Sequence, residues 1–114
     1  MASITTGPGA GTAPAVTLNG ANTDKSGHVH LKTGMGTIGN LAMVFKVTFA
    51  TPYATKPIVL LVPEGVDSFQ LYGNQAVSVR DPDVSVSGFT VKAGFHALQQ
   101  GHPYYGWYYT VIPQ

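Results

Sequence analysis

Apolar and polar residues alternate in short segments along most of this chain, and turn-forming residues separate one segment from the next. HVHLKT (28–33) alternates with a period of two, and LAMVFKVTF (41–49) places four large side chains on one face, Met43, Phe45, Val47 and Phe49. A period of two is typical of a strand with one buried face, whereas a helix needs a period of about 3.6. No helical stretch of convincing length is present. The sequence therefore predicts an all-β protein.

The number and spacing of these segments favour an antiparallel β-sandwich. Seven or eight short strands are expected, separated by turn residues. IVLLV (58–62) is continuously apolar and predicts a strand covered on both faces. The predicted core consists of Phe45, Val47, Phe49, Val59, Leu61, Phe89, Val91, Trp107 and Tyr109.

Composition limits the functions that this chain can have. Its 114 residues suffice for one domain, and only 10% of them are charged, well below the usual quarter. An uncharged polar surface suits a chain that is partly covered by partner subunits. The net charge of +1 offers no field to attract nucleic acid or anionic membranes, so neither is an expected partner.

The N-terminal segment, residues 1–14, is MASITTGPGAGTAP, which has small side chains and no periodicity. It predicts an extended arm, followed by a sandwich domain over residues 15–114. The segment lacks the basic and apolar regions of a signal peptide, and no apolar run approaches the ~18 residues of a membrane span. We therefore expect synthesis in a cytoplasm. The absence of cysteine excludes disulfides and thiolate metal sites.

Two histidines, His28 and His30, lie one residue apart in GHVHLKTG (27–34). On a strand they point the same way, and two imidazoles hold a first-row metal poorly. In a trimer with this strand at the axis, six imidazoles would surround an ion octahedrally. The favoured interpretation is a polar strand face formed by His28, His30 and Lys32, with Val29 and Leu31 toward the core. No metal or other cofactor is expected.

No arrangement of residues predicts catalysis. The histidines have no serine, cysteine or carboxylate placed with them as a triad. TGPGAG and GMGTIG lack the lysine and the following helix of a phosphate-binding loop. Asp81 and Asp83 flank Pro82, which favours a turn over a weak calcium site. The sequence predicts that the protein is not an enzyme.

The aromatic segment HPYYGWYY (102–109) is the richest candidate for recognition. Alternation sends Tyr105, Trp107 and Tyr109 to one face, and Tyr104 and Tyr108 to the other. One set belongs to the core, and the other forms a subunit interface or an exposed ligand platform near His102. The interface is favoured, because an exposed apolar platform promotes aggregation.

Four stretches together suggest a family. GTAPAVTLNGANTDKSGHVHLKTGMGTIG, VFKVTFATPYATKPIVLLVPEG, VSGFTVKAG and the terminal YYGWYYTVI resemble the small β-sandwich domains of bacteriophage virion surface proteins. Those domains occur in capsid decoration proteins, head fibres and tail-fibre tips, and they are distantly similar to H-type lectins. The resemblance implies a homotrimer on the virion surface, with no catalytic residue.

Two functions are compatible with this resemblance. In the first, the protein is a capsid decoration protein whose arm binds the phage coat through Ile4, Thr5, Thr6 and Pro8. In the second, it is a tail-fibre tip that recognises a host surface glycan or protein. The first is favoured because a free fibre tip has no use for an arm that cannot offset its own ordering entropy.

Overall fold

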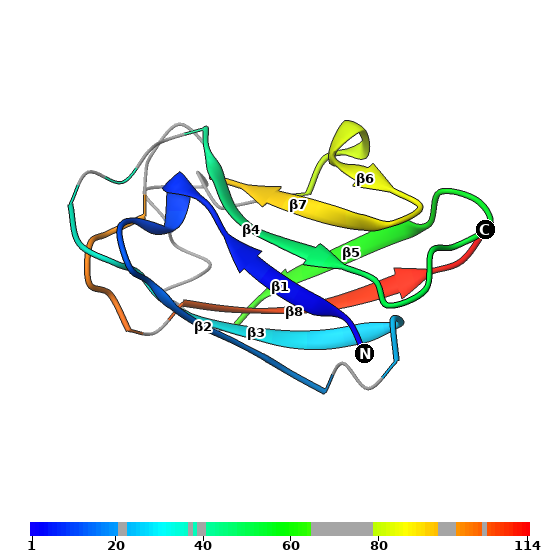
Figure 1. Cartoon of the computed structure of the whole chain (residues 1–114), viewed down its shortest axis with the longest axis horizontal. Coiled ribbons are helices and arrows are strands. Elements are labelled where there is room, and N and C mark those ends of the chain that lie inside the picture. The colour runs from blue at the N-terminus through cyan, green and yellow to red at the C-terminus, as the bar shows by residue number, and fades with distance from the viewer. Residues whose placement is uncertain (21–22, 37, 39–40, 65–78, 94–97, 104) are drawn as a thin grey trace.

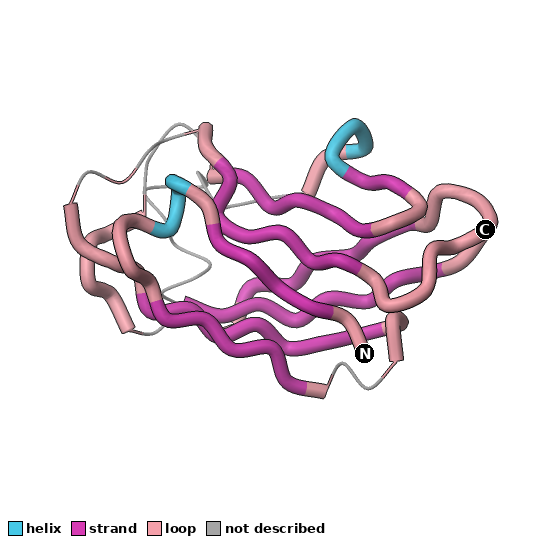
Figure 2. The backbone as a smooth tube through the Cα atoms, in the orientation of Figure 1, coloured by secondary structure: helices cyan, strands magenta, loops and turns pink. Residues whose placement is uncertain are grey.

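The computed structural model describes residues 1–20, 23–36, 38, 41–64, 79–93, 98–103 and 105–114. Within these ranges the chain forms strands and two short 3₁₀ turns, η1 (Pro8–Ala10) and η2 (Asp81–Asp83), and none of its helices could cross a membrane. The strands are β1 (Ser3–Thr6), β2 (Ala15–Asn19), β3 (Ser26–Lys32), β4 (Met43–Thr48), β5 (Ile58–Pro63), β6 (Val84–Ser85), β7 (Gly88–Lys92) and β8 (Tyr105–Ile112). Figure 2 shows how strongly strands dominate the fold.

The strands form two four-stranded antiparallel sheets that pack face to face. One sheet has the order β1-β4-β7-β6, and the other has the order β2-β3-β8-β5 (Figure 1). Each sheet pairs strands that are distant in the chain, such as β3 with β8. The prediction of an all-β antiparallel sandwich is confirmed.

The inner faces of the two sheets supply the core. Trp107, Tyr105 and Tyr109 of β8 are buried, and the ring of Phe45 from β4 lies 5.5 Å from that of Trp107. Val29 and Leu31 of β3 are also buried, as their alternation predicts. Seven of the nine predicted core residues are buried, and the other two, Val59 and Leu61, are partly buried and pack against the same cluster. The aromatic set assigned to the core by alternation therefore includes Tyr105, Trp107 and Tyr109.

The predicted arm differs from what the structure shows. Ser3–Thr6 form β1, which pairs antiparallel with β4 and places Ile4 opposite Val47. Ala10 is fully buried, and Ile4 packs against the core. A Cβ atom at Gly9 would lie 2.8 Å from the carbonyl oxygen of Met43, so this glycine permits close packing of two backbone segments. The small residues that suggested flexibility thus allow the segment to pack against the domain.

The prediction for IVLLV (58–62) is also wrong in one respect. This segment forms β5, but β5 lies at the edge of its sheet and buries one face only. Its outward residues Ile58, Leu60 and Val62 are 43%, 51% and 56% exposed. A continuous apolar run is typical of a strand that is covered on both faces. In the described part of the chain, no segment covers the outward face of β5.

Candidate functional site

A stacked pair of rings lies on the outer face of the β2-β3-β8-β5 sheet. His28 of β3 is directly opposite Tyr108 of β8 in the strand register. Their ring centroids are 4.5 Å apart, with an angle of 16° between the ring planes. The alternation that buries Val29 and Trp107 turns both rings outward, because neighbouring residues on a strand face opposite sides.

Glu64 joins this pair from the end of β5. Its Oε1 atom lies 3.0 Å from Nε2 of His28, and its Oε2 atom accepts a hydrogen bond of 3.1 Å from the Tyr108 hydroxyl. The backbone N–H of Glu64 donates to the carbonyl of Gly106 at 2.8 Å. Three strands therefore meet at one carboxylate, and we call His28, Glu64 and Tyr108 the outer-face cluster.

The electrostatics of the outer-face cluster favour an ionised Glu64. The hydrogen bond with His28 lowers the pKa of Glu64 below its ordinary value, and the bond from Tyr108 and the nearby His30 act in the same direction. The same contact with Glu64 raises the pKa of Tyr108, because it stabilises the protonated phenol. Glu64 therefore presents a fixed acceptor, and Tyr108 keeps its hydroxyl proton at neutral pH.

The chemistry of this cluster suits recognition and packing. Both carboxylate oxygens of Glu64 have a side-chain partner, so the group is held in place by its neighbours. The Tyr108 ring remains 48% exposed beside them. An ordered aromatic ring next to an oriented carboxylate can bind an apolar or hydroxylated surface at low entropic cost.

An apolar strip continues from Tyr108 along the same face. Leu60 and Val62 of β5 lie opposite Thr110 and Tyr108 of β8 in the register, and Ile58 lies opposite Ile112. All the large side chains in this set are at least 40% exposed. We define the apolar strip as Ile58, Leu60, Val62, Tyr108 and Ile112. No charged residue belongs to it.

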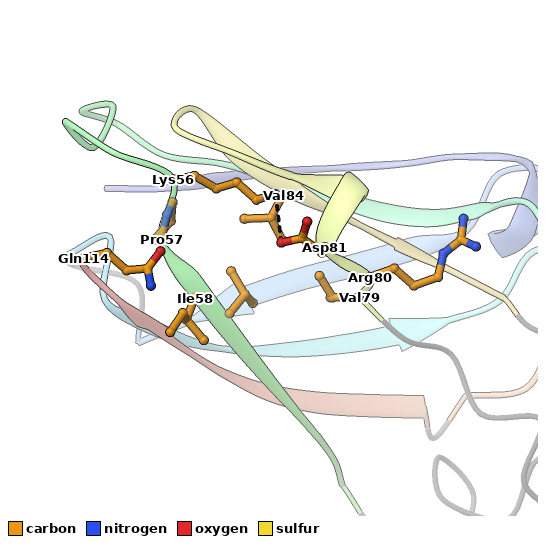
Figure 3. Close-up of a pocket in the computed structure, with 9 residues that line it drawn as sticks. Lys56, Pro57, Ile58, Val79, Arg80, Asp81, Val84 and Gln114 are labelled. Carbon is orange, nitrogen blue, oxygen red and sulfur yellow. Dashed lines mark ion pairs between the residues drawn. The ribbon is translucent and has the colours of Figure 1, made fainter.

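A groove lies beside β5, between the edges of the two sheets. It measures about 370 Å³, and its lining includes the apolar Ile58, Val59 and Val84 as well as charged residues (Figure 3). Lys56 and Asp81 form an ion pair of 2.8 Å at its rim. Asp81 is 86% exposed, so this pair contributes little to stability.

The other predicted site residues do not join the outer-face cluster. The ring of His102 packs against Tyr105 at 4.5 Å, and its backbone N–H donates to Oγ1 of Thr33, so it anchors a loop near the core. His30 is exposed on β3, and Tyr104 lies outside the described residues. Of the predicted arm contacts, Ile4, Thr5 and Thr6 belong to β1, and Pro8 begins η1.

Metal binding has little support in the described parts of the chain. They contain no group of three or more histidine, cysteine, aspartate or glutamate residues that could hold an ion. Asp83 of the DPD turn pairs instead with Lys92 at 3.2 Å and Arg80 at 3.5 Å. An ion held by His28 and His30 would need the same residues from other copies, and it remains the less favoured alternative to a polar strand face.

Sequence reasoning missed Glu64. Its partners His28 and Tyr108 lie 36 and 44 residues away along the chain, so no local motif connects them. The one available signal was Gly106, since a missing side chain on an aromatic strand leaves space for a neighbour.

The fold is a small antiparallel β-sandwich, and the outer-face cluster and the apolar strip lie on the outer face of one of its sheets. Comparison of the chain with family models, curated proteins and solved structures finds no match.

Proposed function

We propose that this chain is a non-enzymatic structural protein of a bacteriophage virion surface that works by associating with copies of itself and with other virion proteins. The apolar strip is the observation that carries this proposal. It places five large apolar side chains on one face of a domain with few charges. Exposed apolar surface of this kind marks a protein contact.

The resemblance of the four sequence stretches to virion surface domains supports the location. It implies a homotrimer on a capsid or fibre, assembled after synthesis in the host cytoplasm. Attachment of a decoration protein through a free arm loses its basis, because Ser3–Thr6 are paired in β1. In the capsid proposal, contacts with the phage coat therefore come from the surface of the sandwich.

The position of the protein in intact particles tests this proposal. Purified phage particles would be labelled with an antibody against the chain and imaged by electron microscopy. Label on the capsid supports a decoration protein, and label at the fibre ends supports a fibre tip. If the antibody detects the chain in the lysate but does not label the particles, both proposals are contradicted.

A host adhesin is the second candidate, and the outer-face cluster favours it. The cluster contains an oriented Tyr108 ring and the Glu64 carboxylate. Sugar-binding sites use groups of these two types, because an aromatic face stacks on the sugar ring and a carboxylate accepts hydrogen bonds from its hydroxyl groups. Binding to a glycan array that Tyr108→Ala abolishes and Ile112→Ala preserves would support it. Equal loss in both variants would contradict a glycan site built on the outer-face cluster, and an absence of any glycan binding would contradict the adhesin.

A further inference from the structure

The outer edge of β5 has backbone hydrogen-bonding groups that no described strand takes up. β5 is the last strand of its sheet, and no described strand pairs with its other side. Within an antiparallel strand, alternate residues direct both backbone groups to the same neighbour. The N–H of Glu64 donates to Gly106 of β8, so the even-numbered residues of β5 bond to β8. Val59 and Leu61 therefore direct their N–H and C=O groups away from the sheet.

The bonding of β8 on its other side agrees with this assignment. The N–H of Val111 donates to the carbonyl of Lys25 beside β3, so odd-numbered residues of β8 bond to β3. Its even-numbered residues remain for β5, as required. Pro57 and Pro63, which have no N–H, occupy the outward positions on either side of Val59 and Leu61. The outer edge is thus a short window bounded by two prolines.

The sequence around this window is complementary to itself when reversed. It is KPIVLLVPE (56–64), and an antiparallel copy centred on Leu60 sets Pro57 against Pro63 and Ile58 against Val62. The same register sets Lys56 opposite Glu64. Lys56 already pairs with Asp81, and Glu64 with His28 and Tyr108, so the match depends on the backbone groups and the apolar side chains. Val59 and Leu61 also face each other, and each pair can exchange both of its N–H···O bonds.

We propose that β5 pairs with β5 of a second copy of this chain, antiparallel, about a twofold axis at Leu60. A twofold contact needs a self-complementary surface, which this strand has in its backbone groups and side-chain sizes. The pairing joins two four-stranded sheets into one continuous sheet. It sets Leu60 beside its own symmetry mate and brings the two apolar strips together.

The contact goes beyond the proposed function, because it specifies a surface and a symmetry whatever the location of the protein. A twofold contact builds a dimer, whereas the resemblance implies a trimer, so the mass of the assembly distinguishes them. It also accounts for the way this edge strand is protected, by prolines at its two ends and not along its middle. β5 carries no charged residue and none of its described residues forms a bulge, so Val59 and Leu61 between the prolines stay open to a partner strand.

Charge substitutions at the twofold axis provide the test. Light scattering and sedimentation would measure the mass of the wild type, Leu60→Lys and Leu60→Glu at matched concentrations. The wild type is expected to be a dimer, and each variant alone a monomer, because like charges meet at the axis. An equimolar mixture of the two variants is expected to recover a dimer, since a lysine of one copy then faces a glutamate of the other across the strands.

Met35→Lys is the matched control, because Met35 is 62% exposed and lies outside the apolar strip. It should remain a dimer, and circular dichroism should show that all three variants are folded. A monomeric wild type would overturn the proposal, as would a trimer. The proposal would also be overturned if Leu60→Lys and Leu60→Glu were each dimeric like the wild type. A mixture of the two variants that stayed monomeric would overturn it as well.

Discussion

Glu64 folds back over Gly106 on the outer face of the sheet. Its backbone N–H donates to the carbonyl of Gly106 at 2.8 Å, and its carboxylate occupies the space where a Cβ atom at Gly106 would lie. From there it reaches both His28 and Tyr108. The glycine is therefore what permits one carboxylate to connect β5, β8 and β3.

Alanine at Gly106 and at Gly88 should have different effects. At Gly106 the new methyl group meets the Glu64 side chain, which can turn away, so the free energy of unfolding should change by no more than about 1 kcal/mol. At Gly88 it meets the carbonyl of Val47 and the Cα atom of Thr48, which belong to the paired strand β4. Gly88→Ala should cost about 1–3 kcal/mol in urea unfolding, as overpacking does. Equal costs would contradict this difference.

Glu64→Gln should remove part of the pH dependence of stability. The pKa of Glu64 is lowered in the folded protein, chiefly by its hydrogen bond with His28, so ionised Glu64 stabilises the fold. That stabilisation is present above the unfolded pKa, near pH 4.5, and is lost as the pH falls through the folded value. Because the group is partly exposed, the difference at neutral pH should stay below about 1 kcal/mol. The free energies of unfolding in urea of the wild type and of Glu64→Gln should converge at low pH. A difference between them that stays constant with pH would exclude the contact of Glu64 with His28.

Ile4→Ala should destabilise the domain, because Ile4 packs against the core from β1. A partly buried isoleucine should cost about 1–2 kcal/mol, at or below the lower end of the range for buried ones. Thr5→Ala is the control, since Thr5 is exposed on the same strand, and it should change stability by less than about 0.5 kcal/mol. An Ile4→Ala protein as stable as the wild type would indicate that residues 1–14 are a free arm after all.

Tyr109→Phe should change stability little at neutral pH and should extend stability into alkali. The Tyr109 hydroxyl is buried without a hydrogen-bond partner among the described residues, so its removal should change stability by about 1 kcal/mol at most, in the stabilising direction. Burial raises the pKa of Tyr109 to about 12, with Asp24 and Tyr53 contributing.

The sign of the pH effect follows from that raised pKa. The folded state favours the neutral phenol, so its stabilisation is complete below the unfolded pKa of about 10 and is lost as the pH rises through the folded value. Thermal unfolding between these limits should show a smaller decline for Tyr109→Phe than for the wild type. Tyr53→Phe is the contrast, because it loses a hydrogen bond of 2.9 Å to the Asp24 carbonyl and should be destabilised at neutral pH. Identical declines for Tyr109→Phe and the wild type would contradict the raised pKa.

The sequence by itself determined the fold class and the buried faces of β3 and β8. HVHLKT predicts buried Val29 and Leu31 between exposed neighbours, and YYGWYY predicts that Trp107 and Tyr109 share a buried face. These features follow from the alternation of side chains along one strand, which is a local property of the backbone. In β4 the alternation is interrupted: Val44 and Phe45 are neighbours and both are buried, beside a register shift between Met43 and Phe45.

Only the tertiary structure decided which strand pairs with which, and the candidate site depends on those pairings. The contact of Glu64 with His28 requires β3, β8 and β5 to lie side by side, and β1 became a strand because β4 offered it an edge. IVLLV has the same letters whether it is a central strand or an edge strand. Its position depends on neighbours from elsewhere in the chain, because burial is a property of the assembled sheet, which local periodicity cannot encode.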